Sequence, residues 1–326
     1  MQIDRRLVGF GLFLVTVGAV MLAVRQGWLP EGTAGRAWSL WPLLLVGAGL
    51  SVALARRSGG GLGGLLIALT LGAMAGGFAS TGSLGLGSCS GDANSGTSFP
   101  DASGTFGGTA RIEVSQSCGD LAISTAPGAA WSVGGVGAED GAPVVDSTSE
   151  RVSIRSDTDR GFGVSAGPTA WQLRLPREPL LTLDVEANAG ESRIQLGGAR
   201  LASVSVERNA GSLDLDLRDV AALDAFRVAL NAGSATIHLP ALPVAGEMEV
   251  NAGSATICRP VDATIGLRIR TDGGFAASND FRDEGLVETD DGWETPGFAT
   301  AAVRITIEAK VNAGSLSLDA TRACAG

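Results

Sequence analysis

Two different patterns of hydrophobic and polar residues divide the chain at about residue 80. The amino-terminal part contains three uncharged apolar runs, at residues 7–24, 40–55 and 62–79. Each run approaches the roughly 20 residues that a helix needs to cross about 30 Å of hydrocarbon. A helix without charges over that length satisfies its backbone internally and buries no charge in lipid. Residues 1–80 are therefore predicted to be a transmembrane region of three helices.

The arginines around these runs predict how the helices are oriented. Arg5 and Arg6 precede the first run, and Arg56 and Arg57 follow the second. Basic residues that flank membrane helices favour the cytoplasmic side, so the amino terminus and the turn after the second run are expected in the cytoplasm. Three crossings then place the carboxy-terminal part of the chain outside the cytoplasm. The chain is therefore predicted to be a multi-pass protein of the cell membrane.

After the apolar runs the pattern changes to short stretches in which apolar and polar residues alternate. A Gly-, Ser- and Thr-rich segment at 81–104 comes first and is predicted to be a flexible linker. Stretches such as 111–114, 152–155 and 171–175 then alternate with a period of two, separated by Gly and Pro. Such alternation is typical of β-strands with one buried face. Residues 105–326 are therefore predicted to form an extracytoplasmic β domain.

A repeat of about 20–22 residues runs through this β region. The motif Asn-Ala-Gly-Ser or Asn-Ala-Gly-Glu begins at Asn188, Asn209, Asn231, Asn251 and Asn312. Residues 271–274 form a degenerate copy one period after the fourth motif, and the fifth motif begins about two further periods on. Residues 117–120 form an early, diverged copy. A fixed period in this range is typical of a solenoid whose coils stack on one another.

The side-chain phase within each repeat is consistent with stacked coils. Counted from each Asn, positions +4, +6 and +8 are mostly apolar and positions +5 and +7 are mostly polar, with exceptions at Ser192 and Arg259. One face of each strand is therefore expected inside and the other in water. Asn and Gly tolerate left-handed backbone, so the motif is predicted to be a corner at which the Asn amides bond to the coils above and below. The predicted fold class is an all-β, single-stranded, β-helix-like solenoid preceded by an α-helical transmembrane region.

Several short motifs resemble those of a known family. They are the Gly-rich apolar helices with Trp41-Pro42-Leu43-Leu44-Leu45 and, further on, Gly266-Leu267, Gly285-Leu286, Trp293, Ala301-Ala302, Ile305-Thr306-Ile307 and Asn312-Ala313-Gly314-Ser315. With these the chain resembles LiaF-like bacterial envelope-stress membrane proteins, whose ectodomain is a β-solenoid of the toastrack or putative-adhesin type. The resemblance implies modulation of membrane-stress signalling through contact with sensor kinases. Three crossings and so regular an Asn-Ala-Gly repeat depart from the family pattern.

Composition and charge exclude several functions. The 326 residues carry 24 basic and 34 acidic side chains, and a net charge of -10 argues against binding nucleic acid. One His and four Cys leave little material for a zinc site. His238 and Cys258 share position +7 of successive coils, so we expect them side by side on an outer face as two exposed polar positions. Catalysis through His238 would also need a nucleophile motif such as Gly-x-Ser-x-Gly, which the sequence lacks.

Acidic residues cluster between 280 and 294 without the spacing of a calcium-binding loop. They are Asp280, Asp283, Glu284, Glu288, Asp290, Asp291 and Glu294. The simplest interpretation is a solvated loop, with a calcium site or a hydrolase site as less favoured alternatives. No catalytic, cofactor-binding or metal site is therefore predicted.

All four cysteines lie in the part that is predicted to be extracytoplasmic, where disulfides persist. Four cysteines allow three pairings, and we favour Cys89–Cys118 with Cys258–Cys324, which would close the two ends of the stack. Cys89 has a second interpretation, because residues 86–89 resemble a lipoprotein cleavage site.

Together these patterns predict a non-enzymatic, membrane-anchored interaction protein that modulates cell-envelope stress signalling. Its expected partners are membrane lipid and another membrane protein such as a sensor kinase, with no nucleic acid. The alternative is a surface adhesin or a self-assembling structural module that forms homo-oligomers through open ends of the stack.

Overall fold

The computed structural model describes residues 96–137, 142–157, 169–260, 262, 264–319 and 324. The chain forms two compact units, Met1–Ser88 and Cys89–Gly326. The three predicted transmembrane helices, at 7–24, 40–55 and 62–79, lie outside the described residues. Among the residues that are described, none belongs to a helix long and apolar enough to cross a membrane.

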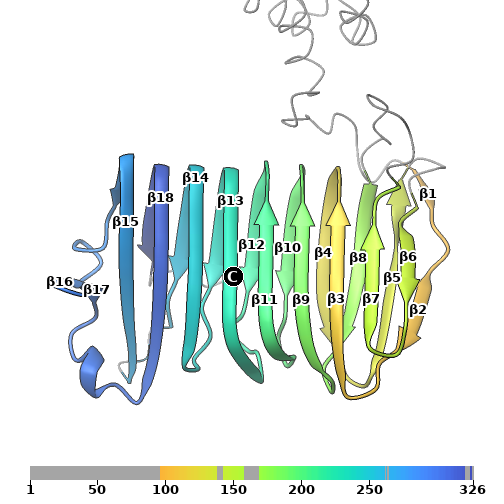
Figure 1. Ribbon diagram of the computed structural model, residues 1–326, viewed down its shortest axis with the longest axis horizontal. Coiled ribbons are helices and arrows are strands. Elements are labelled where there is room, and N and C mark those ends of the chain that lie inside the picture. Colours follow the sequence, from red (N-terminus) through yellow and green to blue (C-terminus); the bar gives the residue numbers. More distant parts are fainter. Residues whose placement is uncertain are drawn as a thin grey trace, which may run out of the picture. The chain divides into compact units, whose positions relative to one another are not determined.

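The described part is mostly β, as the alternating pattern predicted. Its strands form one curled, hydrogen-bonded sheet (Figure 1). The elements are β1 Thr97–Ser98, β2 Ala102–Thr105, β3 Thr109–Gln116, β4 Gly119–Ala126, β5 Ala130–Gly137, β6 Val144–Ser147, β7 Arg151–Arg155, β8 Thr169–Pro176, β9 Leu180–Ala187, β10 Glu191–Gln195, β11 Arg200–Arg208, β12 Ser212–Asp216, β13 Ala222–His238, β14 Val244–Cys258, β15 Ile265–Asn279, β16 Val287–Thr289, β17 Gly292–Glu294, the short 3-10 helix η2 Phe298–Thr300 and β18 Val303–Asp319.

The carboxyl end of the predicted linker is structured rather than flexible. β1 and β2 both pair with β5 in antiparallel fashion, and Phe99 between them is buried. The Gly, Ser and Thr residues of this stretch hid the strand signal, because they carry no apolar alternation. The predicted boundary at residue 104 is therefore wrong for the described residues from 96 onward.

Each repeat contributes a long arm and a short arm that meet at the Asn-Ala-Gly corner. The long arms form one wall, called the long wall here: β3, β9, β11 and the amino-terminal halves of β13, β14, β18 and β15. The short arms form the short wall: β4, β10, β12 and the carboxy-terminal halves of β13, β14, β18 and β15. Neighbouring arms are parallel and in register one repeat apart, as where Leu213 pairs with Ala235 and Ala235 with Ala255.

The last strand does not occupy the place that the repeat period predicted. β18 pairs with β14 on one side and with β15 on the other, so Asn312 neighbours Asn251 and the degenerate copy at 271–274 lies beyond it (Figure 1). β17 pairs with β15 and occupies part of its outer edge, whereas the edge of β14 accepts the last strand. The spacing of the repeats along the sequence does not determine which strand edge the last strand pairs with.

Aliphatic side chains from both walls fill the core, and aromatic side chains close its two ends. Leucine, isoleucine and valine dominate the middle coils. At one end Phe106 stacks on Trp131, with Trp171 also buried. At the other end Phe281 contacts the edge of Trp293. The aromatic groups cover apolar surface that an open stack would expose to water.

The glycine of each corner takes the left-handed backbone, and the asparagine does not. Gly233 has φ of 117°, and no described residue other than glycine has positive φ. A Cβ on Gly233 would also lie 2.0 Å from the carbonyl oxygen of Gly211 in the preceding coil. Both restrictions require glycine at this point of the repeat. The sequence interpretation was wrong in assigning left-handed backbone to Asn as well.

Candidate interaction surface

The five repeated asparagines lie in one column at the corner between the two walls. In four of them the side-chain amide Nδ2 donates to Oδ1 of the asparagine in the neighbouring coil: Asn209 to Asn188, Asn231 to Asn209, Asn251 to Asn231, and Asn312 to Asn251. The amides therefore all point in the same direction along the stack. Ser117 occupies the same corner of the β3–β4 coil, since Gln116 pairs with Ala187 one residue before Asn188.

The outer face of the short wall is rich in hydroxyl groups. Serines of five adjacent strands share one row: Ser212, Ser234, Ser254, Ser315 and Ser278. Thr236 and Thr256 share a second row with Ser317, and the hydroxyls of Thr256 and Ser317 are 3.0 Å apart. Neighbouring strands lie about 4.8 Å apart, so the hydroxyls form a regular array on these strands. The adjoining strands β10 and β12 of the same wall carry ion pairs, such as Arg193 with Glu191 at 2.9 Å.

The outer face of the long wall is instead charged. Arg227 bonds to Glu247 at 2.9 Å and lies 3.8 Å from Glu249, and Lys310 lies 3.9 Å from Glu249. Two rows of these side chains flank an open groove of about 370 Å³, whose lining also includes Met248, Ala309 and Thr271. The ion pairs are largely exposed, so each contributes at most about 1 kcal/mol. They arrange opposite charges in a defined pattern on this face.

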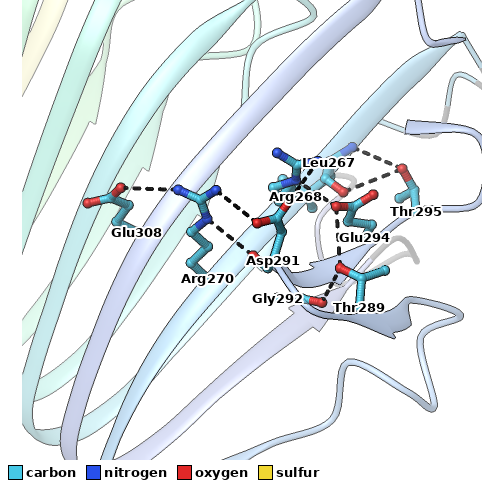
Figure 2. A network of polar contacts seen from close by, with 9 residues as sticks. All are labelled: Leu267, Arg268, Arg270, Thr289, Asp291, Gly292, Glu294, Thr295 and Glu308. Carbon is cyan, nitrogen blue, oxygen red and sulfur yellow. Dashed lines mark hydrogen bonds and ion pairs between the residues drawn. The ribbon is translucent and has the colours of Figure 1, made fainter. Parts of the chain in front are cut away.

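The acidic segment 280–294 is held by arginines of β15 and of its own loop. Arg268 bonds to Glu294 at 2.7 Å, and Arg270 lies 3.5 Å from Asp291 and 3.9 Å from Glu308 (Figure 2). Leu267 and Thr295 extend the network through backbone and hydroxyl groups.

Other members of the segment are engaged differently. Arg282 pairs with Glu288 at 3.2 Å, and Asp280 Oδ1 accepts from the Leu318 backbone N–H. No group of three or more candidate metal ligands occurs among the described residues. The segment therefore fastens the β16–β17 hairpin to the end of the stack.

His238 and Cys258 are neighbours, but neither is exposed. The two residues pair across β13 and β14, and they are only 7% and 4% exposed. His238 Nε2 lies 3.5 Å from Asp214 Oδ1. A disulfide joins Cys258 to Cys324, with Cα atoms 5.4 Å apart, and it brings Cys324 next to β14. The expectation of two exposed polar positions is therefore wrong.

The Cys258–Cys324 disulfide is the one that the favoured pairing predicted, but it does not lie at the expected place. Cys258 lies on β14, and both β18 and β15 lie beyond it, so its disulfide does not close the end of the stack. Cys118 is disulfide-bonded as well. Cys89 lies outside the described residues.

The arrangement of Asp216 and Arg218 at the end of β12 stabilises a charge on the short wall. Burial alone raises the pKa of Asp216, but hydrogen bonds from the Arg218 side chain and backbone N–H outweigh it and lower that pKa. The hydrogen bond to the Asp216 side chain raises the pKa of Arg218 in turn. This pair was not recognised in the sequence, although an Asp-x-Arg at the end of a strand is a local signal.

One buried charged residue was also missed. Ser192 was noted as a polar break at an inward position, and the structure explains it: Arg208 Nη1 donates to Ser192 Oγ at 2.9 Å inside the core. Arg259, the other break, is partly buried, and its Nη2 lies 3.5 Å from the carbonyl oxygen of Glu284. The position of Arg208, three residues before the Gly of its corner, is the only sequence signal for this site.

Two family models match the chain. The N-terminal domain of toast_rack, DUF2154, matches residues 108–240, which extend from the start of β3 to just beyond β13. The LiaI-LiaF-like transmembrane region matches residues 8–53. No curated protein matches.

Several solved structures resemble this chain over about two thirds of its length. A crystal structure described as a "putative cell adhesion protein" from Clostridium sporogenes is 12% identical, with a TM-score of 0.42, covering 68% of this chain and 99% of that one. A "putative adhesin" from Bacteroides fragilis is 9% identical, with a TM-score of 0.28 and coverage of 70% and 100%. A "putative lipid binding protein" from Parabacteroides distasonis is 15% identical, with a TM-score of 0.31 and coverage of 69% and 98%.

The match to the transmembrane region makes this a membrane protein, and the match to the toast_rack domain identifies the curled sheet. The chain belongs to the proteins that join an amino-terminal LiaI-LiaF-like transmembrane region to a toast_rack domain.

Proposed function

We propose that this chain is a non-enzymatic, membrane-anchored interaction protein that modulates cell-envelope stress signalling. The observation that carries the proposal is the combination, in one chain, of a LiaI-LiaF-like transmembrane region and a toast_rack domain. The partner is another membrane protein, such as a sensor kinase, which the transmembrane helices and the β domain contact together.

The orientation belongs to the same proposal. Three helices cross the membrane, the amino terminus is cytoplasmic, and the β domain with its solenoid-like stack lies outside. The Cys258–Cys324 disulfide supports this arrangement, because cytosolic thiols are kept reduced. Reporter fusions after residues 35, 59 and 100 test it, and a cytoplasmic reporter signal at residue 100 would contradict it.

The two walls offer different surfaces, and we propose that the long wall meets the partner. Its rows of opposite charges, such as Arg227 with Glu247 and Lys310 with Glu249, can select a complementary surface and speed association. On β13, β14, β18 and β15 the short wall carries mainly hydroxyls, which offer less basis for discrimination. Its ion pairs, such as Arg193 with Glu191 and Arg218 with Asp216, lie on or next to β10 and β12.

β14 supplies a matched pair of positions for an in-cell test. Ala245 is exposed on the long arm and Ser254 is exposed on the short arm of the same strand. A photocrosslinking residue at Ala245 is expected to capture the partner, and the same residue at Ser254 is not. Deletion of the chain is expected to change the output of an envelope-stress reporter. Equal capture from both positions contradicts the choice of wall, and an unchanged reporter contradicts the signalling role.

Self-assembly, as an adhesin or structural module, is the second candidate. The outer edge of β15 pairs with β17 only at Arg268 and Ile269, and an incompletely paired edge can accept another strand. Light scattering of the full chain in detergent distinguishes the two candidates. Assemblies that grow with protein concentration favour self-association, and a constant mass favours the signalling partner.

A further inference from the structure

Arg208 is the most fully buried charged residue of the described chain. It ends β11, and its side chain is 0% exposed. Its Nη1 donates to Ser192 Oγ at 2.9 Å, whereas Nε and Nη2 have no hydrogen-bond partner in the described part. Burial lowers the pKa of Arg208, while the charges of Asp120 and Glu191 raise it. Two guanidinium nitrogens, which together carry three N–H groups, thus lack an acceptor among the described residues.

A second buried side chain nearby lacks a donor. Gln116 is 1% exposed, and its Nε2 donates to the carbonyl oxygens of Asp120 and Thr169, each at 3.2 Å. These bonds fix which end of the amide is the nitrogen. The other end, Oε1, is buried without a partner among the described residues.

Ala187 lies directly between these two residues. It pairs with Gln116 of β3 on one side and with Arg208 of β11 on the other, so all three belong to one inward row. Neighbouring strands are about 4.8 Å apart, so the two polar residues start roughly 10 Å from each other. Leu230 and Val250 continue the same row in the following coils, which makes the small side chain at Ala187 unusual.

We propose that an enclosed water molecule lies over Ala187, accepting hydrogen bonds from Nε and Nη2 of Arg208 and donating one to Oε1 of Gln116. A water both accepts and donates, so a single molecule satisfies all three atoms. An anion such as chloride could accept from the arginine but could not donate to the glutamine. The water links the β3 coil to the β11 coil across β9, and it requires residue 187 to be small.

The substitution Ala187→Val separates this proposal from an ordinary packing defect. Valine displaces the water and leaves three buried polar groups unsatisfied, so the full chain in detergent is expected to melt several degrees lower. In an Arg208→Met/Gln116→Met background nothing needs the water, and the same Ala187→Val change is expected to leave the melting temperature unchanged or higher. An equal loss in both backgrounds, or no loss in the native background, overturns the proposal.

A crystal structure of the full chain gives an independent measurement, whether or not the variants fold. The expected result is a density peak within hydrogen-bond distance of Arg208 Nε, Arg208 Nη2 and Gln116 Oε1, with no anomalous signal in crystals grown with bromide. The absence of a peak, or a bromide signal at its position, refutes the enclosed water.

Discussion

Asn251 lies within the column of amides, and its side chain takes part in two bonds of that column. Its Nδ2 donates to Asn231 Oδ1 at 2.7 Å, and its Oδ1 accepts from Asn312. Asn251→Ala removes both bonds and leaves the facing atoms of the two neighbours without partners. A net hydrogen bond contributes about 1 kcal/mol, and a stranded polar group costs about 1–3 kcal/mol when buried. Because these side chains are only partly buried, we expect a loss of about 2–4 kcal/mol in the free energy of unfolding.

Asn188 provides the matched control, because it stands at the end of the column. It accepts one bond, from Asn209 Nδ2, so Asn188→Ala removes one bond of the column where Asn251→Ala removes two. The expected loss is therefore about half as large, about 1–2 kcal/mol. Both substitutions leave the glycine of the corner and the backbone pairing of the coils in place.

Denaturant unfolding of the full chain in detergent, followed by tryptophan fluorescence, measures both losses. Trp131 and Trp171 are buried in the same sheet, so their emission reports its unfolding. The midpoint should shift while the slope stays constant, since the surface exposed on unfolding does not change. Equal losses for the two variants would refute the reasoning, because the loss would then not depend on how many amide bonds of the column each substitution removes.

Three further predictions concern the glycine of the corner, the Cys258–Cys324 disulfide and the Asp216–Arg218 ion pair. Gly233→Ala should lower the free energy of unfolding by at least about 2 kcal/mol, because φ is 117° and the new Cβ would lie 2.0 Å from a backbone oxygen. At Gly297, φ is 81° and the nearest atom to a Cβ is 3.8 Å away. Gly297→Ala should therefore lower it by only about 1 kcal/mol in the same unfolding assay. The double variant Cys258→Ser/Cys324→Ser should lose up to about 4 kcal/mol, since the bond closes a sequence separation of 66 residues, and a double variant as stable as the native chain would contradict this. Asp216 has a lowered pKa in the folded chain, so its contribution is present above the unfolded pKa of about 3.9 and is lost as pH falls through the lower folded value. Asp216→Asn should therefore reduce the difference in unfolding free energy between pH 7 and pH 3, and an unchanged difference would show that Arg218 does not stabilise the carboxylate.

The sequence alone determined the strands of the repeat, their inward face and the place of each corner, but not β1 and β2. These features depend on neighbours a few residues away, and the period of two places Leu213, Ile237 and Ile257 inside whatever the rest of the chain does. The spacing of the Asn-Ala-Gly motifs determined the column for the same reason, since residues one period apart become neighbours when the coils stack.

Only the tertiary structure decided the order of the last two long strands and the environment of the polar side chains. β18 lies between β14 and β15, and β17 pairs with part of the outer edge of β15. This order is set by contacts between distant segments, which the repeat period does not contain. Cys258 is buried and bonded to a residue 66 positions away, a partner that the repeat pattern does not indicate. The acceptance of Arg208 in the core likewise depends on Ser192 in another coil and on a small residue at Ala187, and such contacts exist only once distant segments have packed together.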